Sequence, residues 1–211
     1  MNKAVDTTFR RIPERGSKDF EVASAIIDAA RICHVGFVMD DQPYVLPMAC
    51  ARKGDELLLH GSVASRLMNQ LAEGLPCCVT ITHLDGIVLA RSSFHSSMNY
   101  RSVMVFGSAV LVTDEAAKKE GLDVLVEQLA PGRLADLRES TRKELNATHL
   151  LSLPIRTFTT KVRNGPPDDI SADLDLEVWA GVIPLAEQAG EPETAPDMRF
   201  DIPVPGYLSD S

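Results

Sequence analysis

Apolar and polar positions repeat along the chain with two periods, and the shorter period dominates. Alternating apolar and polar side chains, or short apolar runs between turn residues, predict strands. The predicted strands cover residues 33–39, 44–52, 57–60, 76–84, 86–92, 100–114, 150–163 and 178–185. Turn sequences such as "DDQP" and "KGDE" join several of them directly, so we expect consecutive strands to pair as hairpins.

Helical spacing is confined to a few segments between the strands. Residues 22–30 carry apolar side chains at helical spacing and predict a first helix, with Ser17 or Asp19 as N-cap. Three further helices are predicted at residues 63–73, 114–130 and 134–146. These helices interrupt the run of strands and do not alternate with it.

Two residues are unusual for the strands that contain them. Pro47 cannot donate a hydrogen bond to a sheet, so its strand is predicted to lie at an edge or to bend beside a ligand. Gly107 predicts a β-bulge within the long strand 100–114.

The order of elements indicates a fold class. Strands in direct succession argue against a doubly wound parallel sheet and favour an antiparallel β-barrel with added helices. We therefore predict a mainly β fold, with one domain over residues 1–185 and an inserted helical segment at about 114–147. Residues 186–211, rich in Glu, Pro and Ala, are predicted to form an extended arm or a disordered tail.

Composition narrows the classes of partner and compartment. The net charge of −9 and the pI near 5.0 disfavour a nucleic-acid or anionic-membrane surface. The sequence contains neither an apolar run of membrane-spanning length nor the apolar region of a signal peptide. Cys33, Cys50, Cys77 and Cys78 form no C-x-x-C motif and are predicted to be reduced, buried thiols. We therefore predict a cytoplasmic protein.

The stretch "LLLHGSVASRLMNQL", residues 57–71, places a cation in the first turn of a predicted helix. A helix N-terminus carries partial positive charge and unpaired N–H groups, so Arg66 is unfavourable there unless an anion lies near it. A bound phosphate would supply that anion. Alternatively, Arg66 contacts a nearby carboxylate or points into solvent, and the residues of this stretch leave these explanations open.

Other clusters of polar residues predict no second site. The serines of "SSFHSS" lack the motif of a nucleophilic serine, the acidic loop "PPDDISADLD" lacks calcium-loop spacing, and Trp179 is expected to pack in the core or an interface. His95 could face a ligand cleft or hydrogen-bond its own loop. No metal site is predicted for the histidines, because none has a partner at zinc-ligand spacing: His34, His60, His83, His95 and His149.

Six segments occur in the order typical of a known family. They are "RRIPERG", "CHVGFVMDDQPYVLPM", "GDELLLHGSVASRL", "LDGIVLARSSFHSSMNYRSVMVFGSA", "KVRNGPPDD" and "VWAGVIPL", and they cover most of residues 9–185. With them the chain resembles the pyridoxamine 5'-phosphate oxidase-like, FMN-binding split-barrel family, within it the branch that includes the nitroimidazole-resistance proteins. The resemblance implies a homodimer of split β-barrels, with one FMN in each of two clefts between the subunits.

The resemblance also implies which residues contact the flavin. The backbone that lies along the isoalloxazine ring is that of Val45, Leu46, Pro47 and Met48. The segment that binds the ribityl chain and phosphate contains His60, Gly61, Ser62, Ser65, Arg66 and Leu67. The partner chain contributes Tyr100, Arg101 and Ser102, and a later segment that approaches the flavin contains Lys161 and Arg163. Arg66 then becomes a phosphate ligand, assisted by the two serine hydroxyls.

Two positions depart from the pattern of the oxidases that act on pyridoxamine phosphate. Met48 and Leu67 stand where those enzymes carry lysines, so the chain lacks two cations for a substrate that brings its own phosphate. His60 matches a histidine close to the flavin in the nitroimidazole-resistance branch. It is the candidate catalytic residue, as a proton donor or a group that positions substrate.

Two functional hypotheses follow. In the first, the chain is an FMN-dependent oxidoreductase that reduces a small electrophile such as a nitroaromatic compound or a quinone. In the second, it is a non-catalytic carrier or sensor that binds a flavin (FMN or FAD) or haem on the same fold. The expected partners are a small-molecule substrate and a second copy of the chain, without nucleic acid or membrane.

Overall fold

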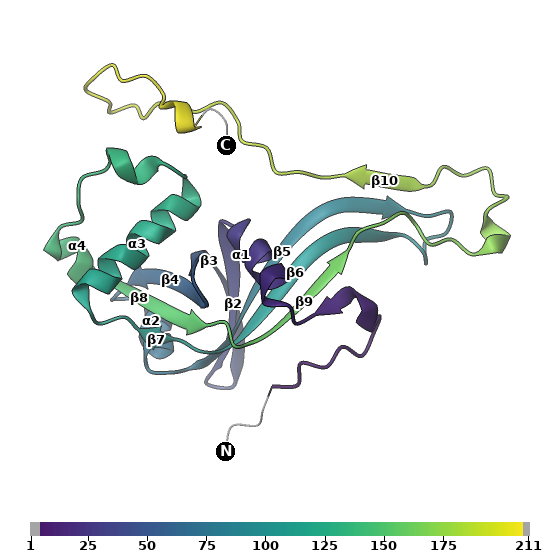
Figure 1. The fold of residues 1–211 in the computed structure, drawn as a ribbon, viewed down its shortest axis with the longest axis horizontal. Helices are drawn as coiled ribbons and strands as arrows, with labels where there is room; N and C mark the ends of the chain where they lie inside the picture. The colour runs from purple at the N-terminus through teal and green to yellow at the C-terminus, as the bar shows by residue number, and fades with distance from the viewer. Residues whose placement is uncertain (1–4, 209–211) are drawn as a thin grey trace.

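The computed structural model describes residues 5–208, and one antiparallel sheet dominates it (Figure 1). The strands are hydrogen-bonded in the order β1-β9-β6-β5-β2-β3-β4-β8-β7, and β10 pairs with β5 outside this path. The predicted mainly β fold with added helices is therefore confirmed. The strands are β1 (Gly16–Ser17), β2 (Ile32–Met39), β3 (Gln42–Lys53), β4 (Glu56–Ser62), β5 (Pro76–Leu89), β6 (Ser97–Ser108), β7 (Val110–Leu111), β8 (Thr148–Pro154), β9 (Thr157–Arg163) and β10 (Gly181–Pro184).

Helices occupy the predicted gaps between the strands. Asp19 is the N-cap of the first helix, where its side chain accepts a hydrogen bond from the Glu21 N–H at 2.9 Å. The second helix begins later than predicted, because the Ser65 side chain caps it by accepting from the Met68 N–H. The helices are α1 (Phe20–Asp28), α2 (Arg66–Ala72), α3 (Glu115–Leu129) and α4 (Arg142–Ala147), with 3₁₀ turns η1 (Pro13–Arg15), η2 (Arg133–Asp136), η3 (Ser171–Asp173) and η4 (Gly206–Leu208).

Two predicted strands merge into one. Residues 76–84 and 86–92 were expected as separate strands, but β5 runs unbroken from Pro76 to Leu89. Its register against β6 shifts between Leu84 and Gly86, so the apparent break in the pattern is a bulge. The prediction of a bulge at Gly107 is wrong, because Gly107 pairs regularly with Cys77. A side chain there would lie 3.0 Å from Leu153 Cδ1, which gives the glycine a packing reason.

The main core lies on the inner side of the curved sheet. Strand side chains such as Leu57, Leu59, Val79 and Ile81 are at most 2% exposed and pack against the apolar faces of α1 and α2. Ile27 of α1 is fully buried in this cluster, so the helix closes the barrel as its apolar spacing requires.

A second, smaller cluster lies under α3. Leu125 of this helix packs against Leu58 and Leu150 on the other side of the sheet. Gly121 permits the close approach, since a Cβ there would meet Leu150 Cδ2 at 2.4 Å. The inserted helical segment therefore covers one part of the outer side of the sheet and leaves the rest uncovered by helices.

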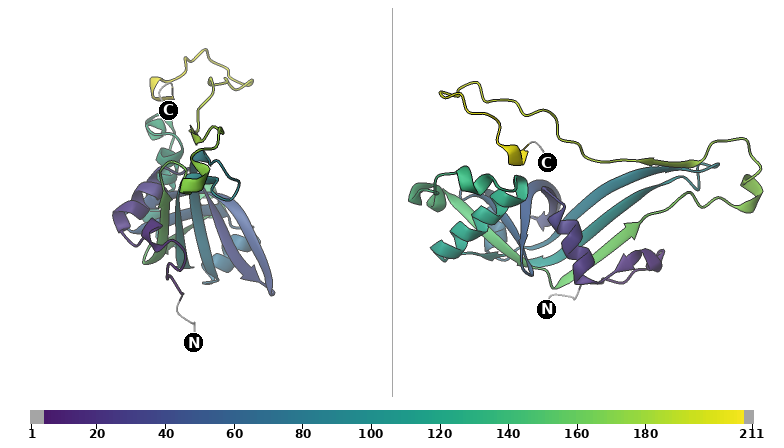
Figure 2. Two further views of the ribbon diagram at one scale, coloured as in Figure 1. Left: turned by 90° about the vertical axis from the view of Figure 1, so that its right-hand side faces the viewer. Right: turned by 45° about the horizontal axis from the view of Figure 1, so that its top comes forward.

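The distal parts of β5 and β6 leave the barrel as an arm, to which β10 adds a third strand (Figure 1). In the right-hand view of Figure 2, the arm projects well beyond the helices. Beyond β10 the chain returns as a tail toward α3 and η2, where the Arg133 guanidinium donates to the Tyr207 hydroxyl at 3.1 Å. Among the described residues of the tail, 186–205 contain no helix or strand.

Candidate functional site

The barrel is open between β3 and β4. Their ladder pairs only residues 50–53 of β3 with residues 56–59 of β4. Residues 42–49 of β3 pair with β2 on one side, and on the other side no strand of residues 5–208 pairs with them; Pro47 lies in this stretch. The prediction that Pro47 marks an edge is confirmed. A free backbone edge of this kind can hydrogen-bond the edge of a planar ligand.

Register places several predicted residues on one side of this opening. Because Ala51 is opposite Leu58, alternation directs Val45 and Pro47 of β3 and His60 of β4 to the same outer side of the sheet. Val45 is 65% exposed there. Leu46 and Met48 point the other way, and Met48 packs against the main core. The Met48 side chain is therefore unavailable to a ligand, and only its backbone borders the opening.

The His60 ring lies beside the opening, but it is partly buried and one of its nitrogens lacks a partner among residues 5–208. Burial lowers the pKa of its imidazole, so the ring is neutral near pH 7. Its Nδ1 atom is buried and has no hydrogen-bond partner among residues 5–208. A neutral ring with a free nitrogen can accept a hydrogen bond or ligate a metal-containing group.

The start of α2 brings Ser62, Ser65 and Arg66 together. Ser62 Oγ accepts from the Ala64 N–H at 3.1 Å, and Ser65 Oγ caps the helix. Both hydroxyl protons remain available to an anion. The Arg66 guanidinium contacts Asp40, in the β2–β3 turn, at 2.8 Å, with both side chains more than 60% exposed. In this structure Arg66 therefore contacts a nearby carboxylate, as one of the explanations for its position proposed. Because the pair is exposed to solvent, it contributes little stability. Leu67, by contrast, belongs to the core.

The residues expected from a partner chain lie elsewhere on the same molecule. In the sheet, β2 and β5 separate β3 from β6 and β9, which carry Tyr100 to Ser102 and Lys161. Arg101 is engaged by Asp85 through two hydrogen bonds of 2.9 and 2.8 Å, which also lower the pKa of that carboxyl. The predicted residues therefore form two groups within one chain, and a single chain does not bring them together.

Arg163 has a different environment from the one the resemblance implied. Its side chain is buried and donates to Asn99, to the Gly165 carbonyl at 3.2 Å and to the Pro166 carbonyl at 3.0 Å. These contacts bind the segment after β9 to β6. Its guanidinium holds the base of the arm together and has little capacity left for a ligand.

Sequence reasoning missed a pocket beside the second group. A cavity of 330 Å³ lies between the N-terminal segment and the outer side of β5, β6 and β9. Ser102 and Lys161 line it, together with Thr80, Thr82, Met104, Thr159 and residues 6–10. The alternating threonines of β5 were the signal for a hydroxyl-lined face, but nothing in the sequence placed residues 6–10 over it.

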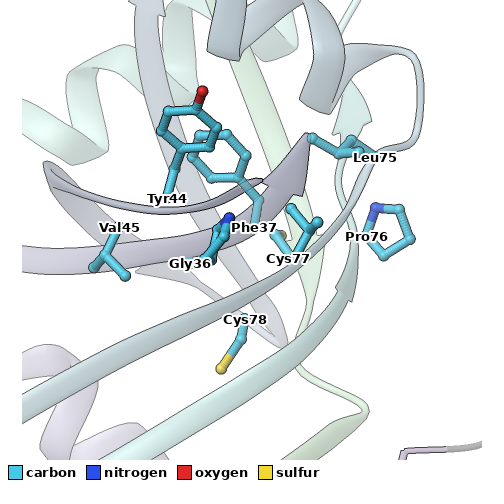
Figure 3. Close-up of a pocket in the computed structure, with 10 residues that line it drawn as sticks. Gly36, Phe37, Tyr44, Val45, Leu75, Pro76, Cys77 and Cys78 are labelled. Atoms are coloured by element: carbon cyan, nitrogen blue, oxygen red, sulfur yellow. The ribbon is translucent and has the colours of Figure 1, made fainter. Parts of the chain in front are cut away.

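A shallow apolar groove lies where β2, β3 and β5 meet at one end of the sheet, and residues of both sides of the sheet line it (Figure 3). It has a volume of 530 Å³, and Gly36 leaves its floor open. In Figure 3, Val45 and the Cys78 thiol point to one side of this floor and the Phe37 and Tyr44 rings to the other. The two rings stack with centroids 5.3 Å apart. The groove offers an apolar surface with few polar groups.

The described residues hold no group of three or more His, Cys, Asp or Glu side chains placed to bind a metal ion. The cysteines are free, and burial raises the pKa of the Cys77 thiol to about 11. Within residues 5–208, no helix combines the length and the apolar character needed to span a membrane.

Comparison with known proteins identifies the family. The family model described as pyridoxamine 5'-phosphate oxidase matches residues 19–162, and the chain belongs to this family. A search of curated proteins gives no match.

Two solved structures align over nearly the whole chain. The FAD and heme binding protein from Mycobacterium smegmatis is 42% identical, covering 93% of this chain and 96% of its own, with a TM-score of 0.89. The flavocytochrome Anf3 from Azotobacter vinelandii is 40% identical, covering 97% and 95%, with a TM-score of 0.90. A proposed 5-nitroimidazole antibiotic resistance protein from Bacteroides thetaiotaomicron, 24% identical over 70% of this chain and 86% of its own with a TM-score of 0.59, shares the fold. The predicted family is confirmed.

Proposed function

We propose that this chain is a flavin-binding protein and that the opening between β3 and β4 holds the flavin. The observation that carries the proposal is the free edge of β3, residues 42–49, next to His60 and the start of α2. The flavin ring would lie against the β3 backbone, and its phosphate would displace Asp40 from Arg66. The likeness to an FAD and heme binding protein at 42% identity favours FAD over FMN.

We further propose that the bound flavin serves an oxidoreductase acting on a small electrophile such as a nitroaromatic compound or a quinone. A flavin supplies the electron chemistry itself, and the protein supplies orientation and exclusion of water. Neutral His60 would accept or donate a hydrogen bond at the ring or substrate. The free thiols are typical of a reducing compartment, which supports a cytoplasmic protein.

The second part of the site is proposed to come from a second copy of the chain. The outer side of the sheet exposes Val45 and the part of the groove formed by Gly36 and Cys78, an apolar surface that a partner would cover. A two-fold axis on this side would bring the β3–β4 opening of one copy to Ser102 and Lys161 of the other. One chain alone would then have half of a flavin site.

A second cofactor is suggested by both similar structures, whose names refer to haem or to a flavocytochrome. His60, with its buried Nδ1 that has no partner among residues 5–208, has the chemistry of a residue that would bind haem iron. When bound, haem would supply one-electron chemistry beside the flavin. We regard a carrier or sensor with flavin and haem as the alternative to the oxidoreductase.

The absorbance spectrum of the freshly purified protein is the first test. Flavin bands support the main proposal, and a Soret band adds haem. A protein that shows neither, even after incubation with FAD, FMN and haem, would contradict both. Anaerobic reduction followed by a nitroaromatic compound or a quinone then separates an enzyme, which is reoxidised rapidly, from a carrier.

Arg66 and Asp40 provide a matched pair of variants for the phosphate assignment. Arg66→Ala should weaken flavin binding about ten- to a hundred-fold, equivalent to about 1.5–3 kcal/mol for a hydrogen bond to a charged group. Asp40→Asn removes the competing carboxylate and should leave the affinity unchanged or tighter. Equal affinity for flavin in Arg66→Ala and the unmodified protein would remove Arg66 from the site.

A further inference from the structure

The 330 Å³ pocket under the N-terminal segment has the features of a second ligand site. Its size falls at the lower end of known small-molecule pockets, about 300–1,000 Å³. The floor consists of outward-facing residues of β5, β6 and β9, and the roof consists of residues 6–10. Residues 6–10 precede the segment that the family model matches, residues 19–162.

Sheet register organises the floor into rows. Thr82, Ser102 and Lys161 are direct neighbours across β5, β6 and β9. Thr80, Met104 and Thr159 form the next row. Phe106 of β6 follows Met104 by two residues and also lines the pocket. The floor therefore runs from a row of polar groups with one cation to an apolar end.

The roof is fastened to the barrel by specific contacts. The Phe9 ring lies against the backbone of Gly16, where a Cβ would be only 2.4 Å from the ring. Lys161 Nζ donates to the Arg11 carbonyl at 2.9 Å, and Lys18 Nζ donates to Thr7 Oγ1 at 2.7 Å. The N-terminal segment is thus held in place over the pocket by the barrel itself.

Two polar groups of the pocket bond only to backbone carbonyls, since Lys161 donates to Arg11 and Ser102 donates to Lys161. Among residues 5–208 no carboxylate pairs with Lys161, since the carboxylate of Asp6 is taken by Arg10 at 2.6 Å. The hydroxyls of Thr82 and Thr159 make no hydrogen bond with any described residue, although Thr159 is only 7% exposed. Asp6 and Arg10 also line the pocket but neutralise each other, so the charge of Lys161 remains unbalanced there and, with the hydroxyls of Thr82 and Thr159, is complementary to an anion.

From this arrangement we infer that the pocket binds a small aromatic carboxylate. The carboxylate lies on the row of Thr82, Ser102 and Lys161, and the aromatic ring lies on Met104 toward Phe106. Residues two apart on one strand are separated by about 6.6–7 Å, which matches the distance from a carboxylate to the far part of a single ring. Phe9 in the roof covers the other side of the ring.

The role of this ligand rests on the proposed function, because Ser102 and Lys161 also belong to the half-site offered to the partner's flavin. The ligand would then lie beside the flavin ring as a substrate or a substrate competitor. Its binding, however, depends only on residues of one chain. The test can therefore be made whether or not flavin binds as proposed.

Calorimetric titration of the full-length protein with benzoate and with benzamide tests the charge requirement. The two ligands have nearly the same shape, so a site built around Lys161 should bind benzoate about ten-fold or more tightly than benzamide. Undetectable benzoate binding, or equal affinity for both ligands, would overturn the inference. If flavin loading abolishes benzoate binding, the flavin ring itself occupies the pocket, which also overturns it.

Variants locate the site and control for folding. Lys161→Met should weaken benzoate binding about ten-fold or more, and Lys161→Arg should restore most of it because the charge is kept. Lys119→Met, which removes an equally charged lysine from the surface of α3, should have no effect. Unchanged benzoate affinity in folded Lys161→Met, or a loss in Lys161→Arg as large as in Lys161→Met, would exclude a charge-based site.

Discussion

The barrel and the arm share β5 and β6, but they differ in how far the apolar side chains of these strands are exposed. In the barrel, Val79 of β5 and Val105 of β6 are fully buried. In the arm, Ile87 of β5 is 40% exposed and Met98 of β6 is 52% exposed. The same two strands therefore pass from a packed core to an arm in which Val88 is still buried but the side that carries Ile87 and Met98 is exposed.

Where the core ends, hydrogen bonds and ion pairs hold the arm together. The arm is held by the β10 ladder, by the Arg163 contacts at its base and by Asp169, which accepts from the Arg91 N–H at 2.9 Å and from its guanidinium at 2.8 Å. A small sheet with one bare apolar side is marginal in water. The barrel therefore has a packed core of its own, whereas the arm exposes apolar side chains on one side.

Truncating an aliphatic side chain to alanine should lower the free energy of unfolding much more in the barrel than in the arm. Leu59→Ala removes a fully buried side chain from the barrel core and should lower the free energy of unfolding by about 2–5 kcal/mol. Ile87→Ala in the arm should lower it by less than about 1 kcal/mol. Urea unfolding of both variants measures the difference. Similar losses would mean that the arm shares the core of the barrel.

A charge on the exposed outer side of the barrel should break the proposed dimer. Val45→Glu places a carboxylate in the centre of an apolar surface and should weaken self-association by about 2 kcal/mol or more, which is about thirty-fold. Leu129→Glu, at an exposed position of α3, is the matched control. Sedimentation across a dilution series measures both. A Val45→Glu dimer as tight as the unmodified one would place the interface elsewhere.

Removing the buried carboxylate of Asp169 should make local opening of the arm easier and leave the barrel unchanged. Asp169→Ala leaves Arg91 without its partner and should ease local opening of the arm by about 1.5–3 kcal/mol. Asp168→Ala removes the neighbouring, exposed carboxylate and should change little. Hydrogen exchange at the Arg91 amide reports local opening, and the amides of β2 report the barrel. Faster exchange in β2 as well would show that the two regions open together.

The sequence predicted the barrel better than the arm for a physical reason. Buried strands such as β2 alternate because one side faces a core, and that alternation can be read directly. In the arm, Leu84 and Ile87 are apolar but exposed, so the pattern indicated two strands where one bent strand exists. Its pairing with β10 joins residues far apart in the chain, and no local pattern encodes such a pairing.

The candidate site was predictable to a similar, limited degree. Arg66 and Pro47 stood out because each conflicts with its own element, and both lie beside the opening between β3 and β4. The surroundings of Arg163 could not be foreseen, since its contacts with Asn99 and Pro166 depend on how the arm begins. The roof over Lys161 depends on the N-terminal segment folding back, which composition does not reveal.

The smallest expected effect concerns His60, on the barrel wall beside the opening. Burial lowers the pKa of His60 in the folded protein from its ordinary value of 6.5, so between these two values the unfolded chain binds a proton that the folded chain does not. Stability from this residue is therefore present above pH 6.5 and is lost as the pH falls toward the lowered value. Because the ring is only partly buried, the loss between pH 7.5 and 5.5 should be under about 1 kcal/mol.

Comparing urea unfolding at these two pH values isolates that contribution. His60→Asn should lose less stability on acidification than the unmodified protein, whatever its stability at pH 7.5. His34→Asn, which removes an exposed imidazole from β2, provides the reference for losing a histidine. If flavin or haem occupies the free nitrogen, the His60 difference should grow on loading, because a ligand of the neutral ring lowers its pKa further. An acid loss identical in all three proteins would show that His60 is not held neutral by the fold.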